Sequence, residues 1–316
     1  MNTPSQINWK PVKHSIIKDE ELANTIHKIG YSINKLITST EIDALTALFN
    51  ENHSFEDKNG GMFYSIYSQD TEYRKKIHFA IDAILKPILN KVCKNYKVLL
   101  NSFVVKISGP NSEFYLHQDT TGLDEWSYSP LSLWIPLDNV SQSNGCLGII
   151  PKSHHFFSPY RSISFPAPFD AIQSTVKQYL QPLEMKKGDV LLFDNRMLHH
   201  SYSNTSGKTR IAVICGLFPK EATLQTCYKP NYVCGGEIET IEHDDDYLLS
   251  GKNFLIDCQK RPTTGVSLGY KMDPYESISK LEFEKICEEY GVKKTNHGVT
   301  DSPTNCNMIG EPIHVL

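Results

Sequence analysis

The spacing of apolar residues predicts helices in the first third of the chain. Residues 15–60 read as an opening helix, a short strand at Gly30–Ile37 and a second helix. A longer apolar stripe then predicts a helix from about Thr71 to Tyr96, which Pro87 should kink or break because proline removes a helical hydrogen bond. His78 lies off that stripe, so we expect its side chain to face solvent.

From Lys97 onward the pattern changes to that of short strands separated by tight turns. Two apolar runs, 131–138 and 146–151, flank Ser143-Asn144-Gly145, a sequence typical of a tight hairpin turn. Many short strands without alternating helices favour a sandwich or barrel over a doubly wound parallel sheet. We therefore expect a mainly β fold with flanking helices, of the α+β class.

Composition narrows the class of protein. With 40% hydrophobic residues, 22% charged residues and a net charge of −4, the chain has no global basic field for nucleic acid. It has no signal-peptide layout and no run of 18 apolar residues, so we expect a cytoplasmic protein without a membrane partner. The eight cysteines are scattered without a C-x-x-C pair, which favours reduced thiols over disulfides or a zinc ribbon.

The chemistry of the chain centres on His117-Gln118-Asp119, at the end of a strand-like run. Residues two apart in a strand point the same way, so an imidazole and a carboxylate are presented together. Non-haem iron oxygenases bind their metal with two histidines and one carboxylate. A second histidine is available at His199-His200, although a His-x-Asp pattern also arises by chance in a chain with 12 histidines.

Two neighbouring features bear on this motif. Lys106 interrupts an apolar strand, either as an edge or surface residue or pointing into a barrel mouth, where its charge needs an anionic partner. The loop 120–130 is polar and carries Trp126 and Tyr128, so it is a candidate lid over the site.

Several blocks, taken in order, resemble the phytanoyl-CoA dioxygenase family of Fe(II)- and 2-oxoglutarate-dependent oxygenases. The resemblance covers about residues 20–218 and implies a double-stranded β-helix, a jelly-roll or cupin-like barrel. The blocks that carry it are His117-Gln118-Asp119, Trp134-Ile135-Pro136-Leu137-Asp138, Asn144-Gly145-Cys146-Leu147, Pro151-Lys152-Ser153-His154, Gly188-Asp189, Leu198-His199-His200-Ser201, Asn204 and Arg210.

The resemblance also implies a site. His117, Asp119 and His199 bind iron; Arg210 and Ser201 hold the distal carboxylate of 2-oxoglutarate; Lys106 and Trp134 complete the candidate cosubstrate-binding set. The residues agree with these roles, because His199 and Ser201 share a strand face and a guanidinium is a planar fork for a carboxylate. In a regular strand His200 points away from His199, and it stands where the family usually has glycine.

The implied reaction uses O₂ and converts 2-oxoglutarate to succinate and CO₂. Halogenating relatives replace the carboxylate ligand with a small residue; Asp119 is present here, so we expect hydroxylation of an unactivated C–H bond. A zinc-dependent hydrolase or isomerase is an alternative, but it leaves Arg210 and Ser201 without a role. A non-catalytic ligand-binding relative is another, and the intact His-Asp-His set argues against it.

We also expect the chain to divide into two parts. We expect residues 1–219 to form the dioxygenase domain and 220–316 to form an extension that packs on the barrel and shapes substrate choice or mediates homo-oligomerisation. Within the extension we expect the acidic stretch 239–246 to be a solvated turn and Ser279–Tyr290 to hold a helix opened by a capping box. Four aromatics fit a polar small-molecule substrate better than an acyl-CoA: Tyr64, Tyr67, Trp126 and Tyr128.

Overall fold

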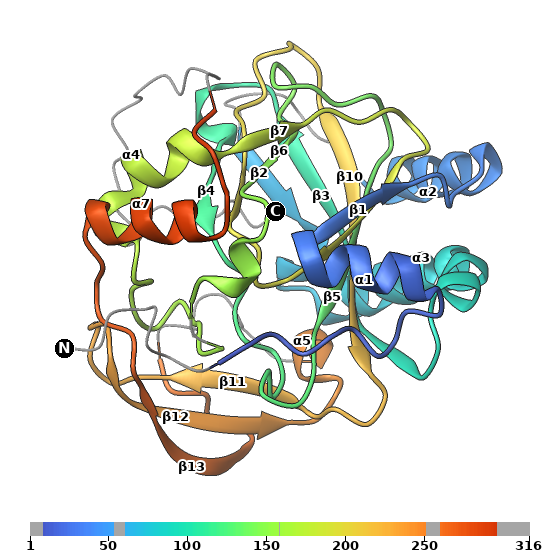
Figure 1. Ribbon diagram of the computed structural model, residues 1–316. Helices are drawn as coiled ribbons and strands as arrows, with labels where there is room; N and C mark the ends of the chain where they lie inside the picture. Colours follow the sequence, from blue (N-terminus) through green and yellow to red (C-terminus); the bar gives the residue numbers. More distant parts are fainter. Residues whose placement is uncertain (1–8, 54–60, 158, 251–259, 296–316) are drawn as a thin grey trace.

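The computed structural model describes residues 9–53, 61–157, 159–250 and 260–295 (Figure 1). The helices are α1 (Glu20–Ile29), α2 (Ser39–Asn52), α3 (Thr71–Val92), α4 (Gln173–Val176), α5 (Tyr247–Ser250) and α7 (Lys280–Glu289), with 3-10 turns η2 (Ser65–Tyr67), η3 (Pro110–Ser112), η4 (Ser153–His155), η5 (Asp170–Ile172) and η6 (Lys177–Tyr179). The strands are β1 (Tyr31–Asn34), β2 (Gly61–Tyr64), β3 (Tyr96–Ile107), β4 (Phe114–His117), β5 (Leu131–Pro136), β6 (Leu147–Ile149), β7 (Gln181–Leu183), β8 (Val190–Asp194), β9 (His199–Ser201), β10 (Arg210–Pro219), β11 (Leu224–Tyr228), β12 (Gly236–His243) and β13 (Val266–Asp273).

These strands form three antiparallel sheets, in the orders β1-β8-β5-β10-β3-β2, β4-β9-β6-β7 and β11-β12-β13. The expectation of a mainly β fold with flanking helices is confirmed. The expected hairpin around Asn144-Gly145 is wrong, because β5 pairs with β8 and β10 whereas β6 pairs with β7 and β9. The turn residues were read correctly, and Gly145 has a φ of 85°, but the turn carries the chain from one sheet to another.

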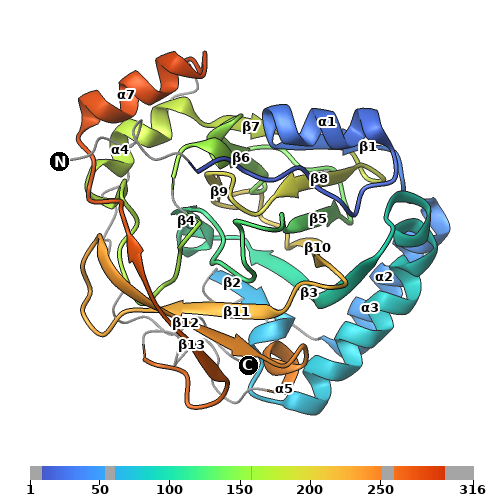
Figure 2. The same cartoon turned by 60° about the horizontal axis from the view of Figure 1, so that its bottom comes forward.

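The six-stranded sheet is buried on both faces, with alternate residues facing opposite sides. Phe103, Val105 and Leu133 pack against helices α1, α2 and α3, which cover the outer face in Figures 1 and 2. Trp134 and Phe193 point inward and pack against the four-stranded sheet. This double burial explains the continuous apolar runs in the sequence.

α3 differs from the expectations at two residues, since Pro87 does not break the helix and His78 is buried. The helix runs through Pro87 without a break; this proline lies on the exposed side, where water can solvate the carbonyl that loses its partner. His78 is buried at 5% exposure, because its Nδ1 accepts a hydrogen bond from the backbone N–H of Asn101 on β3, at 3.0 Å. Side-chain periodicity identified the main stripe of the helix but not the second element that packs beside it.

The contacts between the extension and the rest of the chain include two apolar clusters. Phe283 and Ile286 of α7 join an apolar cluster with Phe156, Tyr179 and Leu198. In a second cluster Ala222 and Leu224 pack with Leu99, Leu123 and Phe218. The second half of the extension is therefore built over the segment 150–180, and its first half over the loop that follows the His-x-Asp motif.

Local signals within the extension were partly right. Ser279 and Glu282 form the expected capping box of α7, and this helix buries Phe283 and Ile286 whereas Leu281 is exposed. The acidic stretch is not simply a solvated turn, because residues up to His243 belong to β12 and Glu239 is buried against Arg261. Among the helices that the structure describes, none combines the length and apolar character needed to cross a bilayer.

A buried ionic cluster fixes the turn between β8 and β9. Asp194 accepts hydrogen bonds from Arg196 Nε at 2.7 Å and from the Arg196 backbone N–H at 2.9 Å, and its other oxygen lies 3.1 Å from His14 Nε2. Arg196 also donates to Ser129 Oγ at 2.7 Å. Burial alone would raise the pKa of Asp194, but Arg196 and His14 hold it well below its usual range. The cluster ties the N-terminal segment to the turn that delivers His199.

We expect Asp194→Asn to lower the free energy of unfolding by about 3–5 kcal/mol, because it leaves the Arg196 charge buried without a partner. Wild type should itself lose this stabilisation only as pH falls below about 4, since a carboxyl with a depressed folded pKa stabilises above its unfolded pKa. Chemical denaturation at several pH values measures both effects. Asp43→Asn, which removes an exposed partner of Lys187, is the control and should change stability by less than about 0.5 kcal/mol.

Candidate metal centre and cosubstrate site

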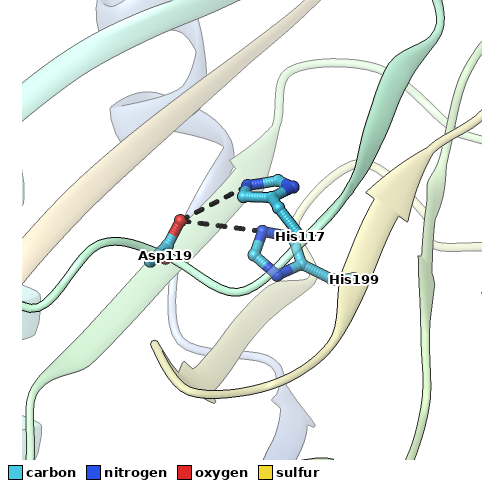
Figure 3. A group of neighbouring side chains, drawn as sticks. All are labelled: His117, Asp119 and His199. Atoms are coloured by element: carbon cyan, nitrogen blue, oxygen red, sulfur yellow. Dashed lines mark ion pairs between the residues drawn. The ribbon is translucent and has the colours of Figure 1, made fainter. Parts of the chain in front are cut away.

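The register between β4 and β9 places two histidines opposite each other. His117, the last residue of β4, pairs with His199, the first residue of β9, and their rings lie 4.2 Å apart between centroids. Asp119 follows two residues later and lies outside the strand. Its Oδ1 is 3.6 Å from His117 Nε2 and 3.8 Å from His199 Nε2 (Figure 3). All three ligand atoms lie within 4.8 Å of one another, the only such group of at least three among the described residues.

Backbone carbonyls orient both imidazoles. His117 Nδ1 lies 2.9 Å from the carbonyl oxygen of Tyr115, and His199 Nδ1 lies 2.9 Å from that of Met197. Because a carbonyl can only accept, each Nδ1 carries the proton and each Nε2 keeps its lone pair. Both lone pairs are therefore available on the side where Asp119 lies. This donor set fits a divalent transition metal that keeps open coordination positions.

The protonation states also suit a metal. Burial, followed by the charge of His117, lowers the pKa of His199 to about 4. Burial would raise the pKa of Asp119, but the neighbouring imidazoles of His117 and His199, together with the charge of Arg161, hold it below its usual value. At neutral pH His199 is thus neutral and Asp119 ionised, which are the forms that coordinate metal.

Two cations lie directly opposite each other on the inner face of the six-stranded sheet. Arg210 of β10 pairs with Lys106 of β3, and both side chains are buried. Among the residues that the structure describes, Arg210 donates only to the carbonyls of Val104 and Gly145, each at 3.2 Å, and its Nε has no hydrogen-bond partner. Its guanidinium carbon lies 5.4 Å from the centre of the Trp134 ring. Burial lowers the pKa of Arg210 to about 10.

Lys106 is held more completely than Arg210. Its ammonium donates to the carbonyls of Ser112 at 2.5 Å, Ser201 at 3.0 Å and Tyr202 at 2.5 Å, which uses all three of its protons. The lysine therefore points inward, as one of the two alternatives predicted, and binds the end of β9. It can act on a bound anion through its charge but has no proton left for a direct contact.

An uncompensated pair of like charges is costly inside a protein. Like charges directly opposite on neighbouring strands destabilise a sheet, and burial strengthens the effect. Across the residues that the structure describes, neither Lys106 nor Arg210 has a carboxylate within 4.0 Å. The pair therefore creates a site that favours an anion, with the free Nε of Arg210 as an unused donor.

Other candidate residues have different surroundings. His200, on the opposite face of β9 from His199, packs against Gly148 and lies 3.9 Å from Glu113. His154 lies 2.9 Å from the carbonyl of His27 and is not part of the metal-capable group. The loop 120–130 is not a free lid, because Glu125 within it is buried and hydrogen bonded.

No sequence pattern pointed to the residues that hold Asp119. Arg161, 42 positions away, donates from Nε to the Asp119 carbonyl oxygen at 2.7 Å, and its guanidinium is paired with Glu125. Tyr64 was expected to contact substrate; its phenol lies near enough to Arg210 and Asp119 for their charges to act on it, although burial is the main reason that its pKa lies well above the usual value.

Comparison with solved structures finds chains of low sequence identity. The non-haem α-ketoglutarate-dependent epimerase SnoN is 17% identical, with 80% of this chain and 97% of that chain covered and a TM-score of 0.46. HygX from Streptomyces hygroscopicus, solved with nickel, 2-oxoglutarate and hygromycin B, is 14% identical, with 64% and 88% covered and a TM-score of 0.45. These low values leave the assignment to sequence comparison.

Sequence comparison identifies curated relatives. Phytanoyl-CoA dioxygenase 1 of Oryza sativa subsp. japonica is 28% identical over 155 residues, covering 48% of this chain and 54% of the relative. A phytanoyl-CoA dioxygenase domain-containing protein 1 homolog of Dictyostelium discoideum is 28% identical over 196 residues, covering 60% and 62%. The chain thus spans less than two thirds of the length of these relatives.

The family model described as phytanoyl-CoA dioxygenase (PhyH) matches residues 32–212, which is more than half of the chain and includes every residue of the candidate site. This chain therefore belongs to the phytanoyl-CoA dioxygenase family.

Proposed function

We propose that this protein is an Fe(II)- and 2-oxoglutarate-dependent oxygenase that hydroxylates an unactivated C–H bond of a small molecule. The observation that carries the proposal is a two-histidine, one-carboxylate group on the same chain as a buried, unneutralised Arg210–Lys106 pair. A zinc hydrolase or isomerase accounts for the first feature but not for the second. A cosubstrate with two carboxylates accounts for both, since one binds the metal and the other binds the arginine.

The residues divide the work between them. The metal is held by His117, Asp119 and His199. Arg210 of β10 orients the distal carboxylate of the cosubstrate, and Ser201 of β9 is the second residue that binds this carboxylate. Lys106 supplies positive charge and fixes the carbonyls of Ser201 and Tyr202. When bound, iron supplies the activation of O₂ that is coupled to the conversion of 2-oxoglutarate to succinate and CO₂.

The proposal includes the arrangement of the two larger sheets. We take the six-stranded and four-stranded sheets, which share an apolar core through Trp134 and Ile149, as the double-stranded β-helix of the family. Metal ligands from β4 and β9 and cations from β3 and β10 then face the same interior. The retained carboxylate of Asp119 supports hydroxylation over halogenation, because it fills the position that a halide needs.

The substrate is proposed to approach along an aromatic wall. Tyr64 contacts Tyr67 and Phe114 with ring centroids 5.1 and 5.7 Å apart, and Phe114 lies 4.8 Å from His117. Tyr115 continues this wall outward and is 39% exposed. Rings with hydroxyl groups suit a small molecule that has both apolar and polar faces.

We expect His199→Ala to abolish tight metal binding. The substitution removes one of three protein ligands, and the two that remain, His117 and Asp119, cannot replace it. Anaerobic titration of the apo-protein with Fe(II) and 2-oxoglutarate should give a weak visible charge-transfer band in wild type and none in the variant. Loss of a residue that only supports a ligand lowers metal affinity by about 10- to 100-fold, and we expect a larger decrease here. If the wild type binds zinc and shows no charge-transfer band, the protein is a metalloprotein of another class and the oxygenase proposal is wrong.

We expect Arg210→Ala to weaken 2-oxoglutarate binding by about 10- to 100-fold while leaving affinity for the metal alone unchanged. Arg210→Lys should recover only part of the loss, because it keeps the charge and loses the planar fork. Calorimetric titration of the Mn(II)-loaded protein measures this. Arg261→Ala, at an arginine of the extension that pairs with Glu239, is the matched control. Equal cosubstrate affinity in wild type and Arg210→Ala contradicts the assignment.

A further inference from the structure

Of the three candidate metal ligands, Asp119 has the least support from secondary structure. His117 and His199 belong to paired strands, whereas Asp119 lies in an extended stretch that pairs with no strand. Two hydrogen bonds hold its peptide groups instead. Its N–H donates to the carbonyl of Asn195 at 3.0 Å, and its own carbonyl accepts from Arg161 Nε at 2.7 Å. The position of this ligand therefore depends on side chains and loops distant in sequence.

Arg161 is itself fixed by a buried carboxylate. Its Nη1 donates to Glu125 Oε2 at 2.8 Å and its Nη2 to Glu125 Oε1 at 2.5 Å, which is a two-point pairing. The Glu125 side chain is fully buried and that of Arg161 is 9% exposed. Because the fork uses both terminal nitrogens on Glu125, the guanidinium plane is set and Nε is aimed at the Asp119 carbonyl.

The backbone around Arg161 is tied to the same loop. Thr121 donates its N–H to the Arg161 carbonyl at 2.9 Å and accepts the Arg161 N–H on Oγ1 at 2.8 Å. The Thr121 hydroxyl in turn donates to the Pro159 carbonyl at 2.5 Å. The segments 119–125 and 159–161 are thus joined at several points, and Asp119 lies at one end of the joined unit.

A purely structural role does not require this arrangement. A bidentate pair with Glu125 would satisfy the two terminal nitrogens of Arg161 wherever the pair lay, but here the third donor reaches the peptide of a metal ligand. We propose that Arg161, held by Glu125, is a positioning residue for Asp119 and sets the geometry of the metal centre. This inference rests on the proposed function, because it requires that His117, Asp119 and His199 bind metal.

The test uses Co(II), which reports both affinity and ligand geometry in its visible spectrum, in the full-length protein. The main variant is Glu125→Met together with Arg161→Met. Removing both charges leaves neither buried without a partner, and replacing a buried ion pair by apolar residues is often tolerated. We expect a thermal midpoint close to that of wild type, an about 10- to 100-fold weaker affinity for Co(II) and an altered d–d spectrum.

A second variant and a matched control make the outcome decisive. Arg161→Lys keeps the charge but cannot reach Glu125 twice and Asp119 as well, so it should fold and still show a changed spectrum with weaker Co(II) binding. Lys229→Met with Asp273→Asn removes another buried ion pair, which lies in the extension, and should leave the Co(II) spectrum unchanged.

Each result is assigned to one hypothesis. If either Arg161 variant binds Co(II) with wild-type affinity and spectrum, Arg161 is not a positioning residue, even though the metal site stands. If His199→Ala also binds Co(II) as wild type does, the metal site itself is wrong and the proposed function fails with it. A spectrum changed equally by the Lys229 and Asp273 substitutions would show a general loss of stability and would also overturn the inference.

Discussion

The antiparallel register of β4 on β9 is the constraint on which the site depends. It sets His117 opposite His199, and the carbonyl two residues before each histidine fixes the ring so that both Nε2 atoms face one point. A slip of β9 by one residue would turn His199 to the other face of the sheet and bring forward His200, which packs against Gly148. The buried cluster of Asp194 and Arg196 protects this register, because it fixes the turn that leads into β9.

The second requirement is electrostatic. The inner face of the six-stranded sheet carries two buried cations directly opposite each other, Lys106 of β3 and Arg210 of β10. Lys106 is satisfied by carbonyls, whereas Arg210 keeps an unused donor. A fold that buries such a pair loses stability unless an anion is bound, so the free protein is organised for a ligand at some cost to itself. Under the proposed function, binding of 2-oxoglutarate would stabilise the same charges that weaken the empty interior.

The third requirement concerns Asp119, which depends on contacts with distant segments of the chain. Asp119 is reached by Arg161 and Glu125, and the loop that carries Glu125 also packs against the first strands of the extension through Leu123. The described residues beyond Pro219 therefore contribute to the frame around the candidate metal centre, and none of them belongs to the metal-capable group.

The sequence by itself determined the elements and the donors: the strands, the helices with their caps, and the spacing that marks His117, Asp119, His199 and Arg210. These are local properties, since periodicity and motif spacing depend on near neighbours. Only the tertiary structure decided which strands pair. It separated β5 from β6, buried His78 behind β3, turned Lys106 onto three carbonyls and brought Arg161 to Asp119 across 42 positions. Contacts of that kind depend on sheet order and packing, which no local pattern encodes.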